Sequence, residues 1–229
     1  MDIAGILFDK DGTLFDFGAT WNGWAATVIG ELAQGDTDRA RALADAARFD
    51  LEAQQFHPDS PVIAGTNREA AECLASALPN RSLTEIEALL TEKAALAPLA
   101  PAVDLVPFLT SLAGRGLRLG VMTNDTEYAA HAHLGAVGVA GHFDFIAGFD
   151  SGFGAKPAPE PLLAFARAMN LAPGQVAMVG DSAHDLIAGR AAGMRTVGVL
   201  TGLAQAHELA PLADVVLPDI GHLPAWLGH

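Results

Sequence analysis

Apolar residues follow two different patterns along this chain. Residues 3–8 form an unbroken apolar run that stops at the polar sequence Asp9-Lys10-Asp11-Gly12. Such a run is typical of a strand that is buried on both faces of a parallel sheet. From Trp21 to Leu32 the apolar positions recur at helical spacing, which predicts an amphipathic helix. Further helices are predicted over residues 39–54, 67–78 and 83–96. Since no strand pattern interrupts residues 15–100, we expect an all-helical insertion there.

After residue 100, helix and strand patterns alternate. Helices are predicted over residues 102–113 and 127–137, and along the apolar stripe Leu162, Phe165, Ala166 and Met169. Strands are predicted over residues 117–123, 145–148, 175–180, 195–200 and 214–217. This alternation favours an α/β fold with a doubly wound, mainly parallel sheet that the first strand joins. Residues 1–14 and 101–229 would then form the core domain, and residues 15–100 an inserted helical domain.

Composition narrows the class of partner. The 229 residues are 51% hydrophobic, which is enough to bury a core, and they carry 13 Lys and Arg against 27 Asp and Glu, a net charge of −14. This balance repels nucleic acid and anionic membranes, so we expect neither as a partner. One cysteine cannot form an internal disulfide, and no apolar run approaches the ~20 residues of a membrane span. We expect a cytoplasmic protein, as a monomer or a homodimer.

Four polar clusters are candidates for a site. They are Asp9-Lys10-Asp11-Gly12-Thr13, Thr123-Asn124-Asp125, Lys156-Pro157 and the sequence from Gly180 to Asp185. Three follow predicted strands directly, and the Lys156 cluster follows a glycine-rich loop. Ligands of open α/β sheets bind at the carboxyl ends of the strands, so the four clusters are expected to converge.

Converging carboxylates repel one another unless a cation lies among them. The cluster therefore predicts a hard divalent metal ion, and Mg²⁺ fits best because it binds a few carboxylates together with waters and a substrate phosphate. Asp9 and Asp11 are two positions apart and would face one substrate, so one could attack while the other moves protons. Thr123 could bind phosphoryl oxygens, and Lys156 adds a positive charge.

Each of these residues also has an ordinary structural interpretation. Thr123-Asn124 and Asp181 could cap the helices that follow them, which is compatible with a role in the site. Lys156 by itself could be a solvated loop lysine. His184 is expected to be a solvated side chain in the first turn of a helix. Trp21 and Trp24 are expected in the core of the helical insertion rather than against substrate. His131 and His133 point to different faces of a helix and do not form a zinc pair.

The clusters resemble, in order, the four motifs of the haloacid dehalogenase-like hydrolase superfamily, and most closely those of its phosphoglycolate phosphatase-like branch. The matching sequences are Asp9-Lys10-Asp11-Gly12-Thr13-Leu14, Val121-Met122-Thr123-Asn124, Lys156-Pro157-Ala158-Pro159 and Val179-Gly180-Asp181-Ser182-Ala183-His184-Asp185. The resemblance implies that Asp9 is the nucleophile and that Asp11 is the general acid and base. It implies that residues 15–100 form a cap that closes over the site.

The same resemblance assigns the remaining roles. Thr123 and Lys156 would bind the phosphoryl group. Thr13 and Asn124, which belong to the same clusters, are further candidates for binding substrate. Asp9, the main-chain carbonyl of Asp11 and Asp181 would hold Mg²⁺, and Asp185 would support them.

The function we expect is a Mg²⁺-dependent phosphatase that acts on a small phosphorylated metabolite, phosphoglycolate-like or a sugar phosphate, through an aspartyl-phosphate. A phosphomutase of the same fold also fits the motifs. A haloacid dehalogenase would not need Asp11 or the carboxylates after Gly180. A phospho-accepting signalling protein would carry its aspartate on a later strand and would lack the insertion. A binding protein without catalysis is the last alternative.

Substrate specificity is expected to come from the cap. Residues 57–68 depart from the helical pattern, and Thr66 opens a helix whose N-terminal amides favour anions. His57 or Arg68 could bind a carboxylate or second phosphate of the substrate there. The alternative is that this segment is only a surface connection.

Overall fold

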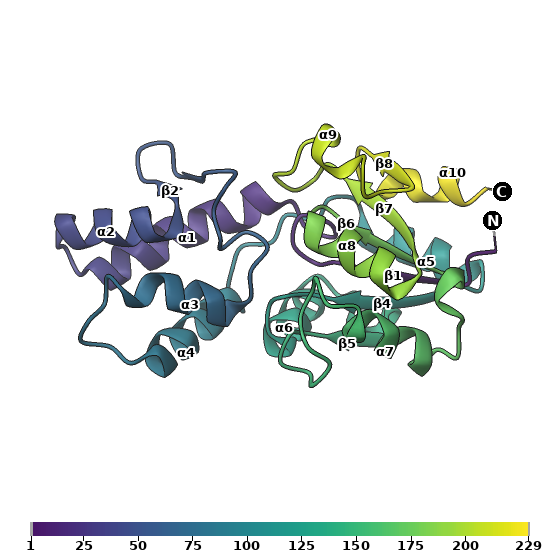
Figure 1. The fold of residues 1–229 in the computed structure, drawn as a ribbon, viewed down its shortest axis with the longest axis horizontal. Helices are drawn as coiled ribbons and strands as arrows, with labels where there is room; N and C mark the ends of the chain where they lie inside the picture. The colour runs from purple at the N-terminus through teal and green to yellow at the C-terminus, as the bar shows by residue number, and fades with distance from the viewer. Residues whose placement is uncertain (1, 229) are drawn as a thin grey trace.

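A computed structural model describes residues 2–228 (Figure 1). The core contains one six-stranded sheet, in which all neighbouring strands are parallel and the order is β5-β4-β1-β6-β7-β8. The strands are β1 (Gly5–Phe8), β4 (Arg118–Met122), β5 (Phe145–Ala147), β6 (Val176–Gly180), β7 (Arg195–Val199) and β8 (Val215–Leu217). The predicted α/β fold with a doubly wound sheet is confirmed.

Strand β1 lies at the centre of the sheet, and the strand order reverses around it. The chain proceeds from β1 to β4 and β5 on one side and returns to β6, β7 and β8 on the other. Phe8 pairs in register with Val121 of β4 and with Val179 of β6. The residues that follow these three strands therefore start from the same level of the sheet, at the position where open α/β folds bind ligands.

Helices cover both faces of the sheet because side chains alternate along each strand. Ile6 and Phe8 pack on one face with α5 and the C-terminal segment, whereas Leu7 packs on the other with α7 and α8. The helices of the core are α5 (Leu105–Gly114), α6 (Glu127–Ala136), α7 (Glu160–Ala168), α8 (Ala183–Ala192), α9 (Ala206–Leu209) and α10 (Leu223–Leu227), with 3₁₀ turns at Ala140–His142, Pro173–Gln175 and Ile220–His222.

The predicted cap, residues 15–100, has an apolar core of its own. Its helices are α1 (Phe17–Ala33), α2 (Thr37–Ala47), α3 (Asn67–Ala75) and α4 (Leu83–Ala94). One face of each helix packs into a cluster that includes Trp21, Leu43, Leu74 and Ile86, and Ala129 of α6 joins it from the core domain. Figure 1 shows these helices grouped beside the sheet, beyond the carboxyl ends of its strands.

The cap is not entirely helical, so the prediction of one helix over residues 39–54 is wrong. Helix α2 ends at Ala47, and a short antiparallel pair follows, β2 (Phe49–Asp50) and β3 (Gln55–Phe56). Arg48 and Gln54 both have a positive φ, and the Asp50 side chain accepts hydrogen bonds from the amides of residues 52 and 53. These features form a turn that brings the Phe49 and Phe56 rings together, with their centres 5.0 Å apart.

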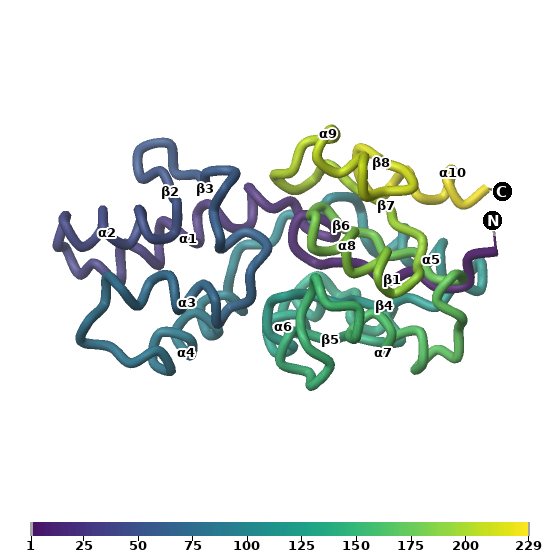
Figure 2. Tube along the Cα trace, viewed as in Figure 1, coloured from purple at the N-terminus to yellow at the C-terminus, as the bar shows by residue number. Residues whose placement is uncertain are grey.

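The two segments that join the cap to the core lie side by side (Figure 2). The amide of Asp16 donates to the Ala100 carbonyl at 2.8 Å, and the amide of Ala102 donates to the Leu14 carbonyl at 2.9 Å. The pairing falls where the sequence predicts the domain boundaries, which stay a prediction. Within residues 2–228, no helix has the length and apolar character needed to cross a membrane.

Candidate active site

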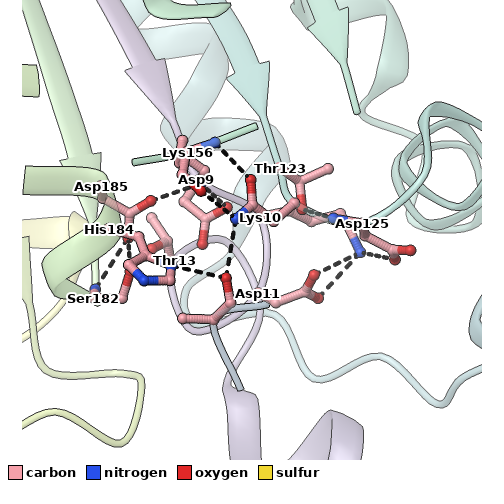
Figure 3. Close-up of polar contacts among 12 residues, drawn as sticks. Asp9, Lys10, Asp11, Thr13, Thr123, Asp125, Lys156, Ser182, His184 and Asp185 are labelled. Carbon is pink, nitrogen blue, oxygen red and sulfur yellow. Dashed lines mark hydrogen bonds and ion pairs between the residues drawn. The ribbon is translucent and has the colours of Figure 1, made fainter. Parts of the chain in front are cut away.

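The ends of three neighbouring strands bring polar side chains together (Figure 3). Asp9 follows β1, and its amide donates to the Val179 carbonyl of β6 at 2.8 Å. Thr123 follows β4 and donates its amide to Ala147 of β5 at 3.0 Å. Asp181 follows β6. These backbone hydrogen bonds extend the sheet by one residue and fix where the side chains begin.

The turn after β1 is tightly wound. The amides of Leu14 and Phe15 both donate to the Lys10 carbonyl, and Gly12 has a φ of 79°. A Cβ atom at Gly12 would lie 2.3 Å from Oδ2 of Asp181. Glycine is therefore required at position 12 for two reasons, the left-handed backbone conformation and the close approach of the Asp181 carboxylate.

Lys156 links two of the carboxylates. Its Nζ donates to Oδ1 of Asp9 at 2.7 Å and to Oδ1 of Asp185 at 2.6 Å, and all three side chains are almost fully buried. Burial by itself would lower the pKa of Lys156, but the carboxylates of Asp185 and Asp9 raise that pKa above its ordinary value. The lysine is therefore held in its charged form.

Asn124 positions Lys156 through the backbone. Its Oδ1 accepts from the Lys156 amide and its Nδ2 donates to the Lys156 carbonyl, both at 2.9 Å. The Asn124 side chain thus binds both backbone groups of one residue and connects the end of β4 to the loop that carries Lys156.

Asp185 is fixed by the start of α8. Its Oδ2 accepts from the amide of Ser182 at 3.0 Å and from the hydroxyl of Ser182 at 2.7 Å, while its Oδ1 accepts from Lys156. A Cβ atom on Gly180 would lie 2.3 Å from Asp185. Ser182, just before α8, therefore holds the Asp185 carboxylate, and the missing side chain of Gly180 leaves room for it at the end of β6.

The carboxylates form a cluster that suits a divalent cation. Ligand oxygens of Asp9, Asp181 and Asp185 lie within 4.8 Å of one another. Burial, together with the nearby Asp185 and Asp11 carboxylates and against the opposing effect of Lys156, raises the pKa of Asp9 to about 7. Burial, Asp9 and Asp185 likewise raise the pKa of Asp181 well above its ordinary value. Such repulsion is what a bound cation relieves, and carboxylate oxygens are the ligands that Mg²⁺ prefers.

Asp11 is held between the cap and the core. Its Oδ1 accepts a hydrogen bond from the indole Nε1 of Trp21, in helix α1 of the cap, at 2.9 Å. Lys10 Nζ lies 2.9 Å from Oδ2 of Asp11 and 5.5 Å from the centre of the Trp21 ring. One carboxylate therefore contacts a cap donor and a core cation at the same time.

Lys10 is completely buried and has three polar partners. Besides Asp11, its Nζ contacts Oδ2 of Asp125 at 3.0 Å and Nδ1 of His133 at 2.9 Å. A lysine ammonium only donates, so Nδ1 accepts and Nε2 of His133 donates to the Ala94 carbonyl at 2.7 Å. Burial and the nearby Lys10 charge lower the pKa of His133. The histidine is therefore neutral and connects Lys10 to the last residue of α4.

A second set of contacts joins the cap to the core at Ala64. Its carbonyl accepts from Nδ2 of Asn124 at 3.0 Å and from Nδ1 of His184 at 3.0 Å. These two donors come from different segments of the core, Asn124 from the loop after β4 and His184 from the first turn of α8, which follows β6. The cap loop that contains Ala64 is thus held over the ends of both strands.

The structure brings some of the predicted substrate residues to the site and leaves others away from it. Asn124 lies in the site, but its side chain binds Lys156 and Ala64. Thr13 is buried below the site, where its hydroxyl donates to Asp181 at 3.3 Å. Neither His57 nor Arg68 lines the cavity described below. Arg68 is exposed and pairs with Glu72 and Glu87, so the alternative of a surface connection describes it better.

Three residues at the site were not assigned to it from the sequence. Trp21 was expected in the cap core, which it joins, but it also donates to Asp11. His184 was expected to be solvated, yet it binds Ala64. No role was predicted for Lys10, whose partners Asp125 and His133 lie 115 and 123 residues away in sequence. The only sequence signal was a lysine placed between two aspartates at the end of a buried strand.

A cavity of about 90 Å³ lies between the cap and the core. Its core side is acidic and includes Lys156 and His184, and its cap side comes from α1, β3, the loop before α3, and the helices α3 and α4. The residues that line it are Asp9, Asp11, Phe17, Trp21, Trp24, Phe56, Val62, Ile63, Ala64, Gly65, Thr66, Asn67, Ala70, Ala94, Thr123, Asn124, Asp125, Lys156, Asp181, Ser182, His184 and Asp185.

A doubly wound sheet with carboxylates at its central strand ends and a helical cap over them defines a class of capped α/β enzymes. The sequence matches the haloacid dehalogenase-like hydrolases over residues 3–193. A phosphoglycolate phosphatase of Shigella boydii serotype 4 (strain Sb227) is 31% identical over an alignment of 249 positions. The alignment covers 99% of this chain and 93% of that protein. The chain therefore belongs to the haloacid dehalogenase-like hydrolases, in the branch that the motifs predicted.

Solved structures share the fold. A haloacid dehalogenase-like hydrolase of Bacteroides fragilis superimposes with a TM-score of 0.74 at 23% identity, over 97% of this chain and all of that one (100%). A structure described as a predicted phosphoglycolate phosphatase, from Haemophilus somnus 129PT, gives a TM-score of 0.71 at 19% identity, over 97% of each chain. At these identities the structures support the architecture only.

Proposed function

We propose that the protein is a magnesium-dependent phosphatase that hydrolyses a small phosphate monoester through a phosphoryl-enzyme intermediate on Asp9. The observation that carries the proposal is the environment of Asp9. Its carboxyl group is buried at the end of the central strand, 2.7 Å from the Lys156 ammonium and clustered with Asp181 and Asp185. Names of relatives such as the Shigella phosphatase support the same class of reaction.

In the first step, a carboxylate oxygen of Asp9 attacks the phosphorus atom and the bond between phosphorus and the alcohol oxygen breaks. Protonated Asp11 gives its proton to that oxygen, so the alcohol leaves neutral and the phosphoryl group stays on Asp9. In the second step, the Asp11 carboxylate takes a proton from water, whose oxygen attacks phosphorus. The bond between phosphorus and Asp9 breaks, which releases inorganic phosphate and restores both residues.

Thr123 and Lys156 would hold the phosphoryl oxygens. The Thr123 hydroxyl accepts from the Asp125 amide at 3.1 Å, and within residues 2–228 no acceptor takes its proton, so the proton is available to a substrate oxygen. Lys156 adds fixed positive charge beside Asp9. Donors that are already in place when charge develops in the transition state are an effective source of catalysis.

Asp9 and Asp181 would hold the metal ion together with the Asp11 main-chain carbonyl, and Asp185 would support them. When bound, Mg²⁺ neutralises phosphoryl charge and offsets the mutual repulsion of these carboxylates. The acidic surroundings would otherwise disfavour a phosphate group, so the proposal requires the ion.

The proposal is tested by phosphate release from a panel of small phosphate esters, with Mg²⁺ and with excess chelator. Acid quenching after mixing with a ³²P-labelled ester should trap label on the protein, and Asp9→Asn should abolish both labelling and turnover while the protein stays folded by circular dichroism. Turnover by folded Asp9→Asn protein would exclude Asp9 as the nucleophile.

Other outcomes would identify the alternatives. Release of halide from a 2-haloacid in chelator, without phosphate release, would indicate a dehalogenase. Formation of an isomeric sugar phosphate would indicate a mutase. Stable labelling without turnover would favour a phospho-accepting signalling protein, although such a protein would not be expected to carry Asp9 on its first strand.

A further inference from the structure

The wall that the cap contributes to the cavity carries no charge. Among residues 2–228, the cap residues at the cavity are apolar or neutral, and they include Phe17, Trp21, Trp24, Phe56, Val62 and Ile63. Since the phosphoryl machinery belongs to the core, the alcohol part of a substrate would face this wall. The chemistry of the wall therefore bears on which alcohols fit.

The two lysine ammonium groups near the cavity already have partners. Lys156 is paired with Asp9 and Asp185. Lys10 is buried and directs its donors to Asp11 and two other residues. A second anionic group on the substrate would have to compete with one of these carboxylates, and a buried charge without a partner is strongly disfavoured.

The N-terminus of α3 does not provide an anion site either, although it lies at the cavity. Thr66 is the N-cap residue, and the carboxylate of Glu69 accepts hydrogen bonds from both its amide and its hydroxyl, at 2.7 and 3.0 Å. An acidic side chain of the cap already occupies this end of the helix. The guanidinium of Arg68, in the first turn of α3, is paired with Glu72 and Glu87.

The side-chain donors of the cap wall are committed in the same way, with one exception. Asn67 donates to the Glu87 carbonyl and to Thr91, and Trp21 donates to Asp11. The indole Nε1 of Trp24 is buried and has no hydrogen-bond partner in the described part of the chain. The wall therefore offers aromatic and aliphatic surface together with one neutral donor.

We propose that the cap selects phosphate monoesters of uncharged, mainly apolar alcohols and disfavours esters that carry a second anionic group, such as phosphoglycolate. This inference rests on the proposed phosphatase function and defines the substrate class for it. An apolar alcohol would gain from contact with Phe17, Trp24 and Val62, whereas a carboxylate would lose its hydration against the same surface.

The test compares three esters of primary alcohols, so that their leaving groups are alike. They are 3-methylbutyl phosphate, 2-hydroxyethyl phosphate and phosphoglycolate, assayed with Mg²⁺. We expect kcat/KM to be highest for 3-methylbutyl phosphate and at least about tenfold lower for phosphoglycolate. Equal or higher kcat/KM for phosphoglycolate would overturn the inference and leave the phosphatase proposal intact.

A cap variant separates charge from shape. Val62→Lys adds a cation to the cavity wall, and Val62→Met adds length without charge. We expect Val62→Lys to raise the ratio of kcat/KM for phosphoglycolate to that for 3-methylbutyl phosphate by about tenfold, whereas Val62→Met should not raise it. An increase with Val62→Met of the same size would show that charge does not set the preference, against the inference.

Binding gives an independent readout if no ester is hydrolysed. The phosphonate analogues of 3-methylbutyl phosphate and phosphoglycolate, with a methylene group in place of the ester oxygen, can be titrated by calorimetry in the presence of Mg²⁺. Tighter binding of the apolar phosphonate would support the preference of the cap for apolar groups, whether or not any ester is hydrolysed. Tighter binding of the carboxylate analogue would overturn it.

Discussion

The indole N–H of Trp21, in the cap, donates to the carboxylate of Asp11, in the core, over 2.9 Å. Trp21 lies in the first helix of the cap, and Asp11 lies three residues beyond the end of β1. Lys10 contacts the same carboxylate from the core. The residue that we assign as general acid and base is therefore oriented partly by the cap, so its position depends on where the cap lies.

Trp21→Phe should reveal this dependence, because it keeps an aromatic ring and removes the N–H donor. We expect kcat to fall about tenfold for an alkyl phosphate, whose leaving oxygen needs a proton from Asp11, and much less for 4-nitrophenyl phosphate, whose leaving group does not. The measurement is steady-state kinetics on both esters with one protein preparation. An equal fall on both would indicate general damage to the site rather than misplacement of Asp11.

Lys10→Met should destabilise the protein strongly. The partly buried carboxylates of Asp11 and Asp125 would lose their shared, fully buried cation, and we expect a loss of about 3 kcal/mol, at the low end of the cost of removing one partner of a buried ion pair. Urea unfolding would measure the loss in the free energy of unfolding. The double variant Lys10→Met/Asp125→Asn removes one of the stranded charges and should recover part of the loss. If the double variant lost as much as the sum of the single ones, the two residues would not be coupled.

The sequence predicts the strand ends of this protein better than the partners of its side chains. An apolar run followed by Asp9 is a local pattern, and the parallel sheet brings Asp9 and Asp181 together once the strands are known. Lys10 and His133 are 123 residues apart, and neither shows a local pattern that would indicate their hydrogen bond. The contact forms only because the fold brings α6, which packs against β5 and against α4 of the cap, beside the turn that follows the first strand.

The cap was predicted less well for similar reasons. The helical pattern of α2 continues in the sequence beyond Ala47, but the turn around Asp50 depends on left-handed conformations at Arg48 and Gln54, residues that usually avoid them. Arg68 is placed by its charged neighbours Glu72 and Glu87, and one of them comes from another helix.

The protonation of Asp9 should make stability depend on pH when metal is removed. Burial raises the pKa of Asp9 in the folded protein to about 7, so between pH 4 and 7 the folded state binds a proton that the unfolded state does not. The contribution of Asp9 to the free energy of unfolding therefore falls as pH rises toward 7, and it is lowest above pH 7, where the buried carboxyl group must be charged. The quantity to measure is the difference between the free energies of unfolding of Asp9→Asn and of the original protein, both in chelator. We expect this difference to increase in favour of the variant from pH 4 to pH 7, by up to a few kcal/mol. A difference that stays constant over this range would contradict the raised pKa.

Mg²⁺ should stabilise the folded protein through the same cluster. At a concentration about 100 times its dissociation constant, a ligand that binds only the folded state adds about 2.7 kcal/mol, which corresponds to a Tm increase of several degrees. Asp181→Asn should remove this increase because it removes one of the three clustered carboxylates. Asp59→Asn, at an exposed carboxylate that pairs with Arg48, should retain it. A Tm increase in Asp181→Asn as large as in the original protein would place the ion elsewhere.

Thr20→Val should stabilise the cap. The Thr20 hydroxyl is fully buried in α1 and has no hydrogen-bond partner within residues 2–228, whereas valine has the same shape without a polar atom. Removing a buried polar group that has no partner should raise the free energy of unfolding by about 1 kcal/mol, measured by urea unfolding. Thr27→Val in the same helix is the matched control, since the Thr27 hydroxyl donates to the Gly23 carbonyl at 2.9 Å near the surface and its loss should change stability by no more than about 0.5 kcal/mol. Both changes replace threonine by valine within one helix, so helix propensity affects them equally. If Thr20→Val alone lowered the free energy of unfolding, the Thr20 hydroxyl would have a partner, such as a buried water molecule.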